Sequence, residues 1–223
     1  MKGSRYKVDL HTHSIISQDG GITAAQYEKM VRDGVLDCIA ITDHNEISFA
    51  RIMHKKLGEH IIIGEEINTS EGEIIGLYLT ETIPGGIGLE ETIASIKHQG
   101  GLVYVPHPYE HFRKGLQQIA LEKIASDIDI VEVFNGRGRF RGKPMFAHQF
   151  AQKNKLVQAA SSDAHGWRGL GYTFSILSEF PARKSLKEFL STAVLEKNYA
   201  PFYTLFYPLL NKIKNNVILI GEN

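Results

Sequence analysis

Histidine and carboxylate side chains recur in this chain at the points where short apolar segments end. His11 and His13 follow the first apolar segment, and Asp163 and His165 follow a later one. Because successive side chains of an extended chain point to opposite sides, the two members of each pair point to the same side. Imidazole and carboxylate groups are ligands for divalent cations. Such groups at successive strand ends predict a hydrolytic site that holds more than one metal ion.

Three residues of the same types follow other apolar segments. His44 comes shortly after one of them, His107 lies between two prolines that restrict its backbone, and Glu65 follows a glycine. Only one of the adjacent Glu65 and Glu66 can point into the same site, and Glu65 is favoured because the glycine directly precedes it. Asp43 either fixes the tautomer of a histidine or caps the following helix, and the sequence leaves both roles open.

Apolar segments alternate with amphipathic segments along the chain, as is typical of strands that alternate with helices. The expected strands are 6–10, 38–42, 60–64, 74–79, 102–105, 128–133 and 156–160. The expected helices are 23–33, with Thr23 as its N-cap, 47–57, 89–99, 145–154 and 185–196. About seven strand–helix units in succession predict a parallel sheet or a barrel.

The composition is that of a single globular domain, expected over residues 1–223, with 43% hydrophobic residues. Its last part, residues 201–223, is aromatic and aliphatic and is expected to pack on this domain or on a second copy of the chain, so a homo-oligomer is one interpretation. Lys+Arg and Asp+Glu both count 25, which argues against a generally basic nucleic-acid surface.

Other features of the sequence concern the compartment. Cys38 is the only cysteine, so no disulfide forms within the chain, and its apolar neighbours predict a buried thiol. The first residues lack the apolar core of a signal peptide, and no apolar run reaches the length of a membrane span. These features predict a cytoplasmic protein that does not interact with a membrane.

The motifs together resemble the PHP (polymerase and histidinol phosphatase) domain family through about residue 175. They are Asp9-Leu10-His11-Thr12-His13-Ser14, Asp19-Gly20, Ile41-Thr42-Asp43-His44-Asn45, Gly64-Glu65, His107-Pro108 and Ser162-Asp163-Ala164-His165. The resemblance implies a distorted (β/α)7 TIM-like barrel that hydrolyses phosphoesters with two or three Zn, Mn or Fe ions. It also implies the metal ligands His11, His13, Asp19, His44, Glu65, His107, Asp163 and His165.

One residue departs from the family pattern. Many members carry a histidine where this chain has Glu73. Glutamate binds hard cations through oxygen, so Glu73 is either a ligand that alters the metal preference or a solvated side chain after Gly72. The sequence leaves both interpretations open.

Phosphate binding needs positive side chains near the metal ligands. Arg113 follows His107 by six residues, and Arg137 and Arg139 lie in a Gly/Arg loop after the strand expected at 128–133. Arginine binds phosphate in a bidentate manner, and a solvated basic loop is the alternative for Arg137 and Arg139. Trp167 either stacks on a substrate ring or covers the edge of the barrel.

The expected activity is hydrolysis of a phosphomonoester or phosphodiester by a metal-bound hydroxide. His11, His13, Asp163, His165 and Arg113 are the expected catalytic residues. The substrate is expected to be a small phosphorylated molecule, such as a nucleotide or sugar phosphate, or a short oligonucleotide. Two alternatives stay open: a metal-dependent amidohydrolase, and a domain that binds metal without catalysis.

Overall fold

The computed structural model of this protein describes residues 5–221, with side chains over residues 5–215. Nine strands form one sheet in this part of the chain, in the order β7-β6-β5-β4-β3-β2-β1-β8-β9. The strands are β1 (Tyr6–Asp9), β2 (Cys38–Ile41), β3 (Ile61–Asn68), β4 (Glu73–Leu77), β5 (Leu102–Val105), β6 (Ile130–Asn135), β7 (Val157–Ser161), β8 (Thr173–Leu177) and β9 (Val194–Lys197).

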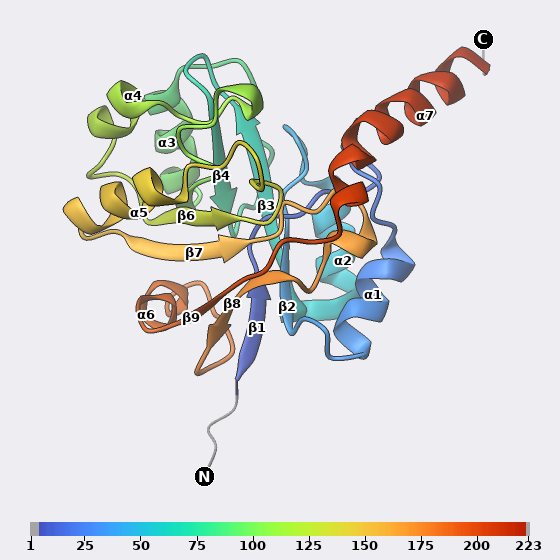
Figure 1. The fold of residues 1–223 in the computed structure, drawn as a ribbon, viewed down its shortest axis with the longest axis horizontal. Coiled ribbons are helices and arrows are strands. Elements are labelled where there is room, and N and C mark those ends of the chain that lie inside the picture. Colours follow the sequence, from blue (N-terminus) through green and yellow to red (C-terminus); the bar gives the residue numbers. More distant parts are fainter. Residues whose placement is uncertain (1–4, 222–223) are drawn as a thin grey trace.

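Helices lie around the outside of the sheet, and the last one projects away from the body (Figure 1). They are α1 (Ala24–Arg32), α2 (Ser48–Leu57), α3 (Leu89–His98), α4 (Gln118–Lys123), α5 (Pro144–Lys153), α6 (Leu186–Ser191) and α7 (Tyr207–Gly221). The short 3-10 turns are η1 (Gly58–His60), η2 (His111–Arg113), η3 (Trp167–Gly169) and η4 (Phe202–Phe206). None of the described helices has the length and apolar content needed to cross a membrane.

The sheet curls until the segments that follow β1 and β7 meet, so the barrel is nearly closed. Thr12 and Ala164 form a parallel bridge. The His13 N–H donates to the carbonyl of Ala164 at 2.9 Å, and the Asp163 N–H donates to the carbonyl of His11 at 2.9 Å. These backbone bonds bring the two sequence pairs of expected ligands side by side.

The expected all-parallel arrangement is wrong for part of the sheet. Strands β1, β2 and β3 are parallel neighbours, as are β5, β6 and β7, but β4 is antiparallel to both β3 and β5. Only residues 69–72 connect β3 to β4, and a parallel pair needs a crossover of a dozen residues or more. The Thr69 N–H donates to the carbonyl of Gly72 at 2.9 Å, which closes the connection as a tight turn.

The predicted helix over 185–196 is also wrong in its last third. Helix α6 ends at Ser191, and Val194–Lys197 forms β9, which pairs antiparallel with β8. Tertiary pairing with a neighbouring strand therefore decides the conformation of this segment. The other predicted strands and helices are present, and α1 begins after Thr23, whose N–H donates to Gln26 Oε1 at 2.9 Å. Strand β8 and the helices α4 and α7 were not expected.

The inside of the barrel is apolar below the mouth. Val8, Ala40, Ile62, Tyr104 and Ile130, from five different strands, are buried in one cluster. The buried Cys38 belongs to the same cluster, as expected. This packed interior forms the floor on which the polar residues at the strand ends lie.

The C-terminal segment contacts the same end of the barrel. Asn211 on α7 donates from Nδ2 to the carbonyl oxygens of Asp19 and His165, each at 2.9 Å. Lys212 Nζ lies 3.6 Å from Asp19 Oδ2. These contacts attach α7 to the mouth of the barrel. That residues 201–223 form a packing segment stays a prediction, and residues 222 and 223 lie outside the described residues. Association with a second copy stays a prediction.

Candidate metal centre

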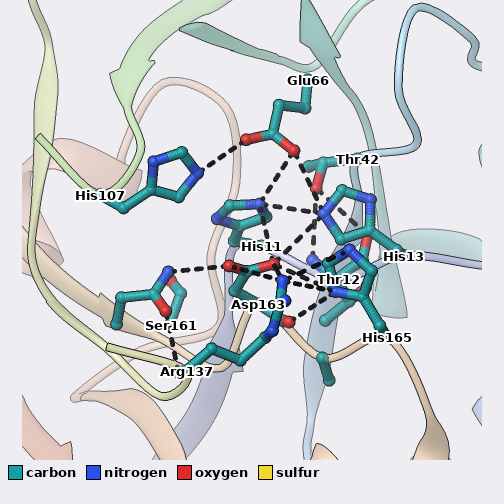
Figure 2. Close-up of polar contacts among 12 residues, drawn as sticks. His11, Thr12, His13, Thr42, Glu66, His107, Arg137, Ser161, Asp163 and His165 are labelled. Atoms are coloured by element: carbon teal, nitrogen blue, oxygen red, sulfur yellow. Dashed lines mark hydrogen bonds and ion pairs between the residues drawn. The ribbon is translucent and has the colours of Figure 1, made fainter. Parts of the chain in front are cut away.

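His11 and His13 lie together in the mouth of the barrel, directly after β1 (Figure 2). Both are fully buried, and their Nε2 atoms are 3.1 Å apart. His11 Nε2 lies 3.6 Å and His13 Nε2 lies 3.5 Å from Asp163 Oδ1, which follows β7. The expected convergence of the first and last motifs is therefore present in the structure.

Glu66, and not the predicted Glu65, is the glutamate at the centre of the site. Glu66 Oε2 lies 3.4 Å from His11 Nε2 and 3.2 Å from His13 Nε2. The same oxygen is 3.3 Å from His44 Nδ1, and Oε1 is 3.1 Å from His107 Nε2. One carboxylate thus contacts four histidines, as a bridging ligand would.

The alternation of β3 explains why the prediction of Glu65 is wrong. Ile62 belongs to the cluster inside the barrel, so Gly64 and Glu66 share its face. A Cβ at Gly64 would lie 2.8 Å from Thr42 Cγ2, which shows that this face is crowded below Glu66. Glu65 points to the opposite face, where Oε2 accepts a hydrogen bond from the Ile83 N–H at 2.9 Å.

Asp19, His44 and His165 form the other half of the cluster. Asp19 Oδ1 lies 3.6 Å from His44 Nε2 and 3.5 Å from His165 Nε2. His165 Nδ1 lies 3.3 Å from Asp163 Oδ1, so Asp163 connects the two halves. Asp163 has a φ of +52°, a conformation that few non-glycine residues adopt and that often occurs at functional sites.

Glu73 is buried at the edge of the cluster, so the interpretation of a solvated side chain is wrong. Its Oε2 lies 3.7 Å from His107 Nε2, and the residue is 6% exposed. Burial, with the nearby charge of Glu66, raises the pKa of Glu73 to about 9. A nearby cation would favour the charged form. That Glu73 binds metal stays a prediction.

The donor atoms converge in three groups within the described residues, each with all its atoms within 4.8 Å of one another. The groups are His13, His44 and His165; His11, His13 and Asp163; and His11, Glu66 and His107. Because His11 and His13 each belong to two groups, the groups are adjacent and suit ions that share ligands.

The distances and the bonding of these atoms fit metal ions. Two ligands about 2.1 Å from one ion, at angles of about 90° to 109°, lie roughly 3.0 to 3.4 Å apart. Most of the separations above are close to that range. Asp19 Oδ1 and His44 Nδ1 are buried and have no hydrogen-bond partner in the described part of the chain. Buried polar atoms without partners are rare in proteins, and atoms arranged around cations explain them.

The charges of the site also depend on one another. Burial opposes ionisation of Asp163, but the Arg137 guanidinium and His11 outweigh it and hold the pKa of this carboxyl well below its usual range. Burial likewise disfavours a charged His13, yet its hydrogen bonds to Asp163 and Glu66 raise its pKa to about 9. Without metal, protons on His11 and His13 therefore compensate the buried carboxylates, whereas burial lowers the pKa of His44 and His165.

A second set of residues holds the histidines in place, and the sequence did not identify its main member. Glu132 on β6 places Oε1 3.2 Å from His11 Nδ1, and its Oε2 accepts from the His107 N–H at 2.6 Å. Tyr104 donates to the same carboxylate at 3.0 Å. A lone glutamate inside the apolar segment 128–133 was the available signal, because a buried charge needs partners.

Asp43 supports the site through a serine. It accepts from Ser14 Oγ at 2.6 Å and from Ser17 Oγ at 3.0 Å, and Ser17 Oγ lies 3.3 Å from His13 Nδ1. Helix α2 begins after Ile47, so Asp43 is not its cap. Asp43 therefore positions a histidine indirectly.

Two of the four predicted substrate-binding residues lie at the cluster. Arg113 pairs with Asp163 and Glu110, and Arg137 Nη1 lies 3.3 Å from Asp163 Oδ1. Both line a cavity of about 670 Å³ together with the expected ligands Asp19, His44, His107, Asp163 and His165, and with Glu66 and Glu73. Arg141, from the same Gly/Arg loop as Arg137, lines it as well, as do Lys114 and Lys212, which were not predicted.

The other two predicted substrate-binding residues do not line this cavity. Arg139 lies over the Tyr199 ring and donates to the carbonyl of Ala200 at 3.4 Å. Trp167 is 39% exposed on η3, with the Arg168 guanidinium 5.3 Å from its ring centre. The loop and turn that carry them direct both side chains to other surfaces.

Two uncharacterized proteins are similar to this chain in sequence. The chain is 36% identical over 194 residues to the uncharacterized protein MJ0417 of Methanocaldococcus jannaschii. The aligned region covers 83% of this chain and 78% of that protein. It is 40% identical over 146 residues to the uncharacterized protein MJ1587 of the same organism, covering 60% of this chain and 84% of that protein. No family model matches the chain.

Solved structures with a similar fold include three kinds of hydrolase. A two-domain protein from Bacteroides vulgatus that contains a predicted PHP-like metal-dependent phosphoesterase has a TM-score of 0.70 and 20% identity, covering 94% of this chain and 70% of that one. The lesion-specific endonuclease PfuEndoQ from Pyrococcus furiosus has a TM-score of 0.60 and 15% identity, covering 86% of this chain and 58% of that one. An amidohydrolase from Chromobacterium violaceum has a TM-score of 0.58 and 15% identity, covering 85% of this chain and 98% of that one.

Proposed function

Because the chain belongs to the same family as MJ0417 and MJ1587 and has the fold of the PHP-like metal-dependent phosphoesterases, we propose that it hydrolyses a phosphomonoester or a phosphodiester. One observation carries the proposal. Three groups of metal-ligand atoms are linked through His11 and His13, and two arginine side chains line one cavity with other members of these groups. A structural metal site is closed and needs about four ligands, whereas this cluster is larger and open.

The cluster would hold two or three divalent ions, of the Zn, Mn or Fe type, through His11, His13, Asp19, His44, Glu66, His107, Asp163 and His165. Such ions supply positive charge and acidify water, so that hydroxide forms near neutral pH. Glu66 would bridge the ions, and Glu73 would add an oxygen ligand next to His107.

Arg113 and Arg137 bind the non-bridging oxygens of the substrate in this proposal. The Arg113 guanidinium is fixed by Glu110 and by Asn135, whose Oδ1 accepts from Nη1 at 2.8 Å. A guanidinium held in this way is oriented before the phosphate arrives, which reduces the entropy lost on binding. Glu132 keeps Nε2 of His11 directed at the cluster by occupying Nδ1.

The proposal is tested with protein loaded separately with Mn²⁺, Zn²⁺ and Fe²⁺. Release of phosphate from a panel of monoesters, and of p-nitrophenol from bis(p-nitrophenyl) phosphate, is expected with metal and not after chelation. His13→Ala is the matched negative control.

The same panel separates the alternatives. Hydrolysis of N-acyl amides without any phosphoester cleavage would establish an amidohydrolase, whose fold the barrel also resembles. Full metal loading with neither activity would establish a metal-binding domain without catalysis. Either outcome would overturn the proposed function.

A further inference from the structure

A second, more apolar cavity adjoins the metal cavity. It has a volume of about 320 Å³ and is lined by Phe140, Phe202 and Phe206 together with Arg113, Arg137 and Arg141. The same three arginines also line the metal cavity. The two cavities therefore meet at a row of guanidinium groups, and the second one has the size of a small ligand subsite.

The aromatic side chains of this second cavity are open to solvent. Phe140 is 72% exposed, Phe202 is 54% exposed and Phe206 is 48% exposed. Their rings contact one another edge to face, with centroids 5.9 Å apart for Phe140 and Phe202 and 5.4 Å apart for Phe202 and Phe206. A group of exposed aromatic rings beside a polar site is unusual on a soluble surface and marks a binding surface.

The arginines fix where the charged part of a ligand lies. Arg137 points to Asp163 and His165 in the cluster (Figure 2), and Arg113 pairs with Asp163. Arg141 instead lies over the Phe112 ring, 4.2 Å from its centre, and makes no ion pair with a carboxylate among the described residues. The arginine side chains would thus lie between a phosphate at the metal centre and the aromatic cavity.

Flat aromatic groups suit such walls best. Phenylalanine rings and guanidinium planes both stack on nucleobases, whatever the base, because every base has a π-face. A sugar phosphate without a base has no π-face to stack on the rings, so it gains less from them. The apolar walls and the adjoining cations therefore match a base joined to a phosphate through a sugar.

We propose that the cavity formed by Phe140, Phe202 and Phe206 binds the base of a nucleotide whose phosphate lies at the metal centre. This inference rests on the proposed function and names its substrate class. Residues 202–206 come from η4, so the C-terminal segment would supply one wall of the substrate site.

Binding of non-hydrolysable phosphonates to the metal-loaded protein tests the proposal. The phosphonate analogue of adenosine 5′-monophosphate is compared by calorimetry with the same phosphonate of ribose, which lacks the base. We expect the nucleotide analogue to bind roughly five-fold to a hundred-fold more tightly, as one stacked base provides. Phe140→Ala and Phe206→Ala should reduce this ratio towards one without changing the affinity for the ribose analogue.

Tyr203→Ala is the matched control, since Tyr203 is an exposed aromatic residue of the same η4 turn that does not line the cavity. It should keep the wild-type ratio. A trinucleotide phosphonate with the same terminal base distinguishes a free nucleotide from a strand end, and tighter binding of either one than of the ribose analogue supports the proposal. Equal binding of all three analogues would overturn it.

Failure of the proposed function gives a different result. If phosphoesters are hydrolysed but the base changes neither affinity nor rate, the cavity does not bind bases and the phosphoesterase activity stands. If the base-dependent affinity is present but no phosphoester is hydrolysed, the base subsite stands and the proposed activity is wrong.

Discussion

Exchanging Glu66 and Glu65 for glutamine, one at a time, tests the centre of the metal site with a control one residue away. Both glutamates are buried on β3, and they point to opposite faces of the strand. Glutamine has nearly the same shape as glutamate but no charge. A difference between the two variants therefore reports which face of the strand carries the metal ligand.

The structure sets the expected size of each effect. Glu66 oxygens lie 3.1 to 3.4 Å from nitrogens of four histidines, so its charge acts on every ion of the cluster. Loss of a residue that merely orients a ligand weakens metal binding by about 10- to 100-fold. Removing the charge of a bridging ligand should cost more, so Glu66→Gln should weaken binding by more than about 100-fold, or about 2.7 kcal/mol.

Glu65→Gln should leave metal binding unchanged. The amide oxygen still accepts the hydrogen bond from the Ile83 N–H, so the cost to folding is below about 1 kcal/mol. Burial already raises the pKa of Glu65 to about 7, which means that its charged form is disfavoured in the folded protein. Above pH 7 the neutral amide should therefore be tolerated as well as the carboxylate.

Metal content after dialysis and calorimetric titration with Mn²⁺ and Zn²⁺ measure the effect, and circular dichroism shows whether each variant folds. The reasoning is refuted if Glu65→Gln loses metal while Glu66→Gln keeps it. It is equally refuted if both variants bind metal as the wild type does, since the four histidines would then hold the ions without a bridge.

Three further predictions concern the same site. His13→Ala should reduce hydrolysis by at least about 100-fold at saturating metal while the barrel still folds, and a wild-type rate would contradict its role as a ligand. Glu73→His should shift the preference from manganese-like to zinc-like ions in competition titrations, and unchanged preference and stoichiometry would mean that Glu73 binds no metal. The free energy of unfolding of the metal-free protein should fall as the pH rises from about 6.5 to about 9. The pKa of His13 rises on folding from 6.5 to about 9, so its stabilising contribution is complete below pH 6.5 and lost as the pH passes 9. Glu73, with a pKa raised to about 9, acts in the same direction. Thermal melts at pH 6.5 and 9 with chelator should show this loss, and the metal-loaded protein should show the opposite trend because metal displaces these protons.

The sequence was sufficient to identify most of the cluster because its residues follow a local rule. An apolar run identifies a strand, and the polar residues directly after it lie at the mouth of a barrel. His11, His13, His44, His107 and Asp163 all satisfy this rule, and the structure places their side chains together. The same rule cannot decide between adjacent residues such as Glu65 and Glu66, since a shift of one residue moves a side chain to the other face.

Local sequence patterns do not predict contacts between segments that lie far apart in the sequence. Glu132 contacts His11 across 121 positions of sequence, and the role of Glu132 depends on how β6 is placed relative to β1 in the nearly closed barrel. The β3–β4 hairpin interrupts the alternation that a purely parallel barrel requires, although its short connection, residues 69–72, was visible in the sequence.

The C-terminal segment shows why apolar composition alone is ambiguous. Its aromatic and aliphatic residues suggested packing on the domain or on a second copy, and both interpretations treat them as structural. In the structure, Asn211 holds the backbones of Asp19 and His165, while Phe202 and Phe206 stay exposed beside the arginines. Polar residues of the segment therefore attach it to the metal centre, and its aromatic residues are left free to bind a ligand. A segment that served only to cover the barrel would bury its aromatic rings and expose its amide.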